Sequence, residues 1–129
     1  MIGWLREDMV RAFHLDQLAQ HGGMAGVRSS ELLESALARP QNLAAYGSPT
    51  LADLAASYAF GLAKNHPFID GNKRVAFASA GAFLAMNGYT LTVPQAEAAA
   101  KILALAAGEI DEADLAAWID SNLTPRPPR

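Results

Sequence analysis

The sequence contains no cysteine among its 129 residues. This absence excludes disulfide bonds, metal sites built on thiolates, and cysteine nucleophiles, and it is consistent with a reducing compartment. The sequence also has no excess of positive charge, because 10 basic and 13 acidic residues give a formal net charge of −3. A broad basic surface for nucleic acid or for an anionic membrane is therefore not expected, although a small basic site remains compatible with this balance.

Long apolar runs are absent as well. No stretch reaches the roughly 20 residues that a membrane-spanning helix needs, and the richest one, Val75 to Met86, resembles a buried core helix. The segment from Met1 to Asp8 becomes acidic before any apolar run develops, so it does not have the pattern of a signal peptide. We therefore expect a cytoplasmic protein that makes no contact with a membrane.

Hydrophobic residues are abundant and helix formers dominate. They make up 51% of the chain, which favours a globular fold over disorder. The 27 alanines favour helices that pack closely together. We predict an all-α fold with one domain over residues 3–123, about six helices around a central buried helix, and a flexible tail over residues 124–129.

Helical spacing of apolar residues, together with start and stop signals, gives the expected elements. Ser29 or Ser30 can cap the second helix, and Pro40 is expected just after its end. Thr50 with Asp53, Thr92 with Gln95, and Asp111 with Asp114 resemble capping pairs. The expected helices cover about 6–20, 30–39, 51–65 and 72–86, followed by one opened by Thr92 that runs to about Ala107 and a last one opened by Asp111. The fourth is apolar on nearly all sides, which predicts that it is the central helix.

The segment from His66 to Arg74 carries the residues suited to chemistry. Pro67 favours a helix end at Asn65, and the segment lies between this end and the start of the apolar helix. Backbone N–H groups that open a helix lack internal partners and form an anion site with the helix dipole. Gly71 lets the backbone approach a ligand closely, and Phe68 is expected to insert into the core and fix the loop.

Charged side chains in the same segment complete a possible phosphate site. Lys73 supplies a mobile positive charge, and Arg74 supplies a planar fork that suits phosphate oxygens. Asp70 is a hard oxygen ligand that could hold Mg²⁺ accompanying a nucleotide. A neutral imidazole at His66 could accept a proton from a hydroxyl at cellular pH. Taken singly, a helix-end histidine, a capping aspartate and a solvated first turn would explain these residues. Taken together, they favour phosphate chemistry.

The stretch His-Pro-Phe-x-Asp-Gly-Asn-Lys-Arg at 66–74 resembles the signature of the Fic/Doc superfamily, in its death-on-curing (Doc) branch. The similarity extends over nearly the whole chain, from about Trp4 to Leu123. Four further segments resemble the same branch: 26–28, 32–42, 58–65 and 83–89. The resemblance implies that His66 is the catalytic base, that Asp70 holds Mg²⁺, that Gly71 and Asn72 form the anion hole, and that Arg74 grips phosphate.

Two residues differ from the Fic pattern, and both bear on whether AMP or a phosphoryl group is transferred. Lys73 stands where Fic enzymes have a second glycine, and Phe77 stands where they have a second arginine. Both match the Doc branch, in which the lysine joins the phosphate site, ATP binds in the reverse direction, and the γ-phosphate is transferred. The resemblance thus implies that His66, Asp70 and Lys73 are catalytic, and that Gly71, Asn72, Lys73 and Arg74 bind nucleotide. Ala78 replaces a polar side chain of some Doc relatives.

The resemblance also implies partners. Doc toxins of type II toxin–antitoxin systems stop translation by phosphorylating elongation factor Tu, and a Phd-type antitoxin neutralises them. The alternatives are AMP transfer to a protein hydroxyl and a degenerate partner-binding module without turnover. Among other residues, His14 and His21 are interpreted as surface or satisfied helix histidines. Arg28 could belong to a charge network or to the antitoxin surface. The segment from Arg39 to Tyr46 is expected to flank the active site.

Overall fold

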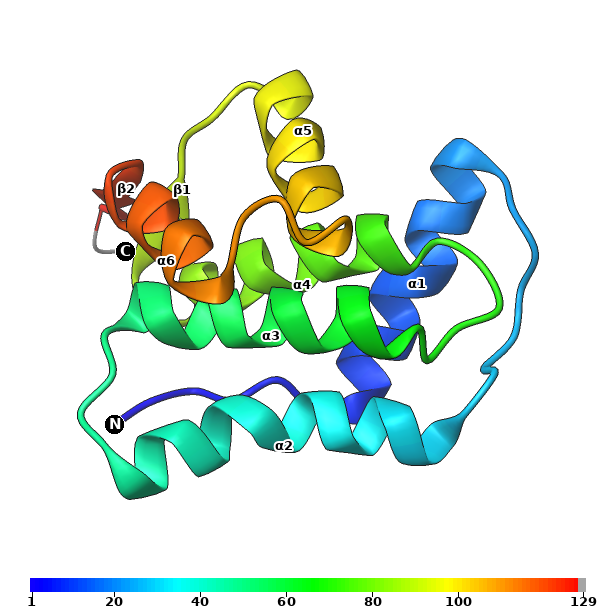
Figure 1. Ribbon diagram of the computed structural model, residues 1–129, viewed down its shortest axis with the longest axis horizontal. Coiled ribbons are helices and arrows are strands. Elements are labelled where there is room, and N and C mark those ends of the chain that lie inside the picture. The colour runs from blue at the N-terminus through cyan, green and yellow to red at the C-terminus, as the bar shows by residue number, and fades with distance from the viewer. Residues whose placement is uncertain (128–129) are drawn as a thin grey trace.

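The computed structural model describes residues 1–127 and confirms an all-α fold (Figure 1). The two residues at the end of the expected tail, 128–129, lie outside the described part of the chain. Over the described residues the elements are α1 (Glu7–His21), α2 (Ser30–Tyr46), α3 (Leu51–Asn65), α4 (Asn72–Met86), β1 (Tyr89–Leu91), α5 (Gln95–Ala106), α6 (Glu112–Asp120) and β2 (Leu123–Pro125). None of the helices in residues 1–127 is long and apolar enough to cross a membrane.

Two of the three expected capping pairs are present. Thr50 accepts a hydrogen bond from the amide of Asp53 and Asp53 accepts one from the amide of Thr50, which closes the start of α3. Asp111 and Asp114 do the same at α6. Ser29 accepts from the amide of Leu32 and caps α2. These pairs satisfy amides that would otherwise lack partners.

The prediction that the second helix ends before Pro40 is wrong, because α2 continues through Pro40 to Tyr46. An interior proline removes one backbone hydrogen bond and costs about 3 kcal/mol. Burial of apolar side chains offsets this cost, because the apolar face of α2 that includes Leu33 and Leu37 continues past Leu37. Pro40 is itself buried and Ala44 packs against the core.

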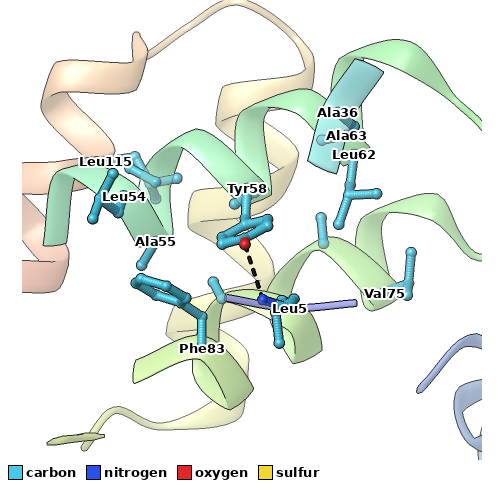
Figure 2. Close-up of a cluster of buried hydrophobic side chains, with 14 of the residues drawn as sticks. Leu5, Ala36, Leu54, Ala55, Tyr58, Leu62, Ala63, Val75, Phe83 and Leu115 are labelled. Carbon is cyan, nitrogen blue, oxygen red and sulfur yellow. Dashed lines mark hydrogen bonds between the residues drawn. The ribbon is translucent and has the colours of Figure 1, made fainter. Parts of the chain in front are cut away.

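The most buried helix is α3 rather than α4, so the predicted identity of the central helix is wrong. α3 packs against α2, α4, α5 and α6 and runs through the middle of the molecule (Figure 1). α4 is also largely buried, but Phe77 and Ala82 remain partly exposed, and α4 has seven buried residues where α3 has ten. Figure 2 shows side chains of α3, including Leu54, Tyr58 and Leu62, filling the space between these helices.

Small residues let the helices around α3 approach closely. A Cβ atom added at Gly61 would lie 3.1 Å from the Cα atom of Ala36 on α2. The Tyr58 hydroxyl accepts a hydrogen bond of 3.1 Å from the amide of Leu5, which joins the N-terminal segment to α3 (Figure 2). Burial raises the pKa of Tyr58, and the Leu5 hydrogen bond only partly opposes this effect.

The end of the described chain is more ordered than expected. Thr124 and Pro125 belong to β2, which pairs antiparallel with β1, so the tail does not begin at residue 124. The expected capping of the fifth helix by Thr92 is also wrong. Pro94 is the N-cap of α5, and it makes no side-chain capping bond. The amide of Thr92 instead donates to the carbonyl of Asn122 because this segment extends the strand pairing.

Candidate active site

The motif of residues 66–74 lies where α3 ends and α4 begins, as predicted. His66 is the C-cap of α3 and adopts a left-handed backbone with φ 49° and ψ 55°. This conformation costs a residue with a Cβ atom roughly 1–2 kcal/mol, so neighbouring contacts must hold it. Arg28 supplies them, because its guanidinium donates to the carbonyls of His66 and Asn65, both at 2.7 Å. Arg28 thereby caps the end of α3 and fixes the backbone of the candidate base.

The linker between α1 and α2, residues 22–29, runs along the motif loop. An isolated antiparallel bridge pairs Val27 with Phe68. Next to it, the amide of Ile69 donates to the carbonyl of Gly26 at 3.0 Å. The loop is therefore held by backbone contacts from a segment about 40 residues earlier in the chain.

Phe68 and Asn72 lock the loop from inside. Phe68 is buried, as expected. Its amide donates to Asn72 Oδ1 and its carbonyl accepts from Asn72 Nδ2, both at 2.9 Å. Asn72 Nδ2 also lies 3.5 Å from His66 Nδ1, which is at the outer limit for a hydrogen bond. The Asn72 side chain thus supports the loop, so its contribution to the expected anion hole would come from its backbone N–H.

The start of α4 is unlike the starts of the other helices in residues 1–127. Gly71 is its N-cap with φ 79°, there is no side-chain capping bond, and the first turn has no acidic residue. Each of the other helices has a capping side chain, an acidic first turn, or both. At α4 the first turn instead carries the exposed cations Lys73 and Arg74. Its open amides and positive side chains form a site that suits an anion.

Asp70 lies beside this open helix end, and both of its carboxylate oxygens are engaged. Oδ1 accepts from the amide of Gly71 at 2.8 Å, and Oδ2 accepts from the amide of Met24 at 3.2 Å. A Cβ atom at Gly23 would lie 2.8 Å from Oδ2, so the linker approaches the carboxylate closely only because Gly23 has no side chain. The position of the carboxylate therefore depends on the linker as well as on the motif.

A surface cavity of about 410 Å³ brings the candidate residues together. Its volume is in the range of small-molecule sites. The cavity contains every site residue that the sequence predicted and adds two apolar side chains from α5. Its lining residues are His66, Ile69, Asp70, Gly71, Asn72, Lys73, Arg74, Ala99 and Leu103.

The expectation that Arg39 to Tyr46 flank this site is wrong. These residues belong to the C-terminal half of α2, which lies beside the start of α3, whereas His66 follows the end of α3 (Figure 1). A cavity of about 470 Å³ lies at that opposite end and includes Asp53 and Glu112. Both of these are acidic, so it does not have the chemistry of a phosphate site.

The comparisons with known proteins agree with this geometry. The family model described as "Fic/DOC family" matches residues 4–84. The chain belongs to the Fic/Doc family. It is 44% identical over 89 residues to "Toxin Doc" of Mycolicibacterium smegmatis, a match that covers 67% of this chain and 65% of that protein. It is 33% identical over 106 residues to "Protein kinase doc" of Escherichia phage P1, covering 81% of this chain and 83% of that protein.

The residues of this Fic/Doc chain fit a magnesium nucleotide by the chemistry of their donors. Mg²⁺ bound with nucleotides uses one or two carboxylates together with phosphate oxygens and water. Asp70 offers one carboxylate at the cavity, and the open start of α4 offers amide donors for phosphate. No group of three or more acidic or histidine side chains within residues 1–127 could hold a metal ion by itself. A metal would therefore need the phosphates as further ligands.

Two residues that support the site were missed or left undecided by sequence reasoning. His14 is only 2% exposed, and its Nε2 lies 2.7 Å from the Asp70 carbonyl oxygen. The interpretation of His14 as a satisfied helix histidine is confirmed, but its partner is the motif loop. The spacing from Val10 could have placed it on the inner face of α1, four residues further on. The role of Arg28, which the sequence left open, is to cap the end of α3. Sequence spacing does not reveal this contact, because it joins distant segments of the chain.

Proposed function

We propose that this Fic/Doc protein is the toxin of a type II toxin–antitoxin module and transfers the γ-phosphate of ATP to a hydroxyl group of a protein. The observation that carries this proposal is the start of α4. It is open and positively charged, and it lies in the same cavity as His66 and Asp70. The name of one Doc relative, a toxin, supports the role as a toxin, and the name of the other, a protein kinase, supports phosphoryl transfer. Elongation factor Tu is the proposed substrate.

In the proposed reaction the hydroxyl oxygen of the substrate attacks the γ-phosphorus. The bond between this phosphorus and the oxygen bridging to the β-phosphate breaks, and ADP leaves. The His66 imidazole accepts the hydroxyl proton, while the amides at the start of α4, with Lys73 and Arg74, stabilise the phosphate charge. Positioning and charge stabilisation supply most of the acceleration in such reactions.

Asp70 would hold Mg²⁺, which would neutralise phosphate charge when bound. Lys73 and Phe77, the two residues that differ from the Fic pattern, favour transfer of the terminal phosphate over transfer of AMP. Lys73 lines the cavity at the start of α4 and is exposed, so it can reach a phosphate there. Phe77, one turn after Arg74, is partly buried against the core and offers no charge for a second phosphate contact.

Radiolabelled ATP tests the reaction directly. With purified elongation factor Tu, we expect transfer of label from γ-labelled ATP and none from α-labelled ATP. His66→Ala should reduce the rate by about 10²–10⁴-fold, the usual loss when a general base is removed. Lys101→Ala, on α5 and over the Trp118 ring, is the matched control and should leave the rate unchanged. Label from α-labelled ATP would show AMP transfer instead.

Growth measurements test the role in the cell. We expect overproduction of the wild-type protein to arrest growth, and co-production of a Phd-type antitoxin to restore it. His66→Ala should not arrest growth at equal protein levels. Equal arrest by wild type and His66→Ala would contradict catalysis and favour a binding module that acts without turnover.

A further inference from the structure

His14 of α1 is a buried polar residue that the proposed reaction does not use. Its ring stacks on Phe68 with ring centroids 3.9 Å apart and an interplanar angle of 12°. Its Nε2 lies 2.7 Å from the carbonyl oxygen of Asp70. A carbonyl oxygen can only accept, so His14 Nε2 carries a hydrogen and donates it. Burying an imidazole is unfavourable unless it makes such a bond, so this contact explains a polar residue at a core position.

This hydrogen bond controls more than one atom of the motif loop. The Asp70 carbonyl belongs to the planar peptide group that also contains the amide of Gly71. That amide donates to Asp70 Oδ1 at 2.8 Å. Because the peptide group is rigid, a donor that fixes its carbonyl also fixes the direction of the Gly71 amide. One of the two amide contacts of the Asp70 carboxylate, the one at Oδ1, therefore depends on the same bond.

The same contact occupies the carbonyl that immediately precedes the N-cap of α4. In a longer helix the carbonyl of Asp70 would accept from the amide of Arg74, four residues later. Here the carbonyl is directed toward His14, and the first backbone bond of α4 joins the amide of Val75 to the carbonyl of Gly71. The Asp70 carbonyl is thus engaged by a side chain of α1, while the carbonyl of Gly71 accepts the first bond of α4.

We propose that His14 is a positioning residue of the phosphate site. Its Nε2–H holds the Asp70–Gly71 peptide group so that the Asp70 carboxylate and the first amides of α4 keep the arrangement that binds a nucleotide phosphate. The consequence for turnover rests on the proposed phosphoryl transfer, but the consequence for the loop does not. His14 contacts the loop backbone and none of the reacting atoms.

Two substitutions separate the hydrogen bond from the ring. His14→Phe keeps an aromatic ring that can stack on Phe68 and removes the donor. His14→Gln keeps an N–H donor at nearly the same distance along the side chain and removes the ring. Leu15→Ala, at the neighbouring exposed position of α1, is the control. A role in packing alone predicts that His14→Phe resembles the wild type and that His14→Gln is the weaker variant. The proposed positioning role predicts instead that His14→Phe binds Mg-ATP more weakly than His14→Gln does.

Three readouts make up the test: the melting temperature, the Kd for Mg-ATP by calorimetry, and amide hydrogen exchange at residues 71–74 without nucleotide. We expect His14→Phe to melt near the wild type, to bind Mg-ATP about 3–10-fold more weakly, and to exchange these amides faster by a similar factor, as for one lost hydrogen bond. His14→Gln should melt lower but bind more tightly than His14→Phe. Leu15→Ala should match the wild type.

Unchanged exchange at residues 71–74 in His14→Phe would overturn the proposal, and so would binding losses that simply follow melting temperature in both variants. Failure of the proposed function looks different. The wild type would then transfer no label from γ-labelled ATP, while the exchange of residues 71–74 would still depend on the His14 donor.

Discussion

The starts of α3 and α4 show two opposite ways of finishing a helix. At α3, Thr50 and Asp53 exchange hydrogen bonds with each other's amides at 2.9 and 3.1 Å and place an acidic group in the first turn. At α4, Gly71 offers no side chain, and Lys73 and Arg74 put positive charge where the helix dipole disfavours it. The first arrangement satisfies the helix from within the chain. The second leaves donors and positive charge for a ligand.

The difference shows that this Fic/Doc protein gives up stability at the start of α4, the helix start that lines the candidate site. Capping lowers the free energy of the folded chain by about 1 kcal/mol per helix, and α4 forgoes it. Contacts outside α4 compensate. Phe68 is inserted in the core, Arg28 caps the end of α3, and His14 holds the Asp70 carbonyl. None of these three residues lines the cavity, so the open helix end is supported from outside it.

The largest effect is expected from making the start of α4 resemble the other helix starts. Lys73→Glu places an acidic residue in the first turn, which favours the helix dipole by about 0.3–1 kcal/mol. We expect the melting temperature to stay the same or rise. The Kd for Mg-ATP, measured by calorimetry, should weaken by roughly 100-fold, because a charged contact of up to 3 kcal/mol is lost and repulsion is added. Tight binding by this variant would show that α4 is not the phosphate site.

A smaller loss is expected when one cation of the open end is removed. Arg74→Ala should weaken Mg-ATP binding about tenfold, the lower range for a hydrogen bond to a charged group. Arg74→Lys keeps the charge and loses the planar fork, so it should recover only part of the affinity. Raising the salt concentration should narrow the difference between wild type and Arg74→Ala. Calorimetry at two salt concentrations measures this, and a salt-independent difference would argue against a phosphate contact.

The closed end of α3 should respond in the opposite sense. Asp53→Ala removes one half of the reciprocal capping pair and should lower the free energy of unfolding by about 1 kcal/mol in urea titrations. The Kd for Mg-ATP should stay at the wild-type value, since Asp53 lies in the first turn of α3 and His66 follows the last residue of this helix. A joint loss of stability and nucleotide affinity would mean that the two helix ends are coupled.

The smallest expected effect is a pH dependence at the middle of α3. Burial raises the pKa of Tyr58 above its usual value of 10.0. The unfolded chain therefore loses the tyrosine proton first as pH rises. Stability should be constant with respect to Tyr58 below about pH 10 and should fall as pH rises through the folded pKa. Thermal melts between pH 9 and 11 test this. Tyr58→Phe should begin from a lower stability, having lost the Leu5 hydrogen bond, and should show a shallower decline.

Local signals in the sequence predicted much of the fold and of the candidate site. Thr50 and Asp53 are three residues apart, as are Asp111 and Asp114, so this spacing alone predicted two helix starts. Pro40 misled the prediction because burial of the apolar face beyond it outweighs a lost backbone bond. The greater burial of α3 was not predictable from composition, since both helices are apolar and they differ only in how completely their neighbours cover them, with ten buried residues in α3 and seven in α4.

The sequence by itself determined the all-α class, most helix starts and the group of residues from His66 to Arg74, because each depends on neighbours along the chain. Only the tertiary structure decided how that group is held. The bond from His14 to Asp70 spans 56 residues and the bonds from Arg28 to residues 65 and 66 span 37 and 38. Such contacts form only after the helices pack, because packing is what brings a side chain of α1 and a linker residue onto the backbone of the motif loop.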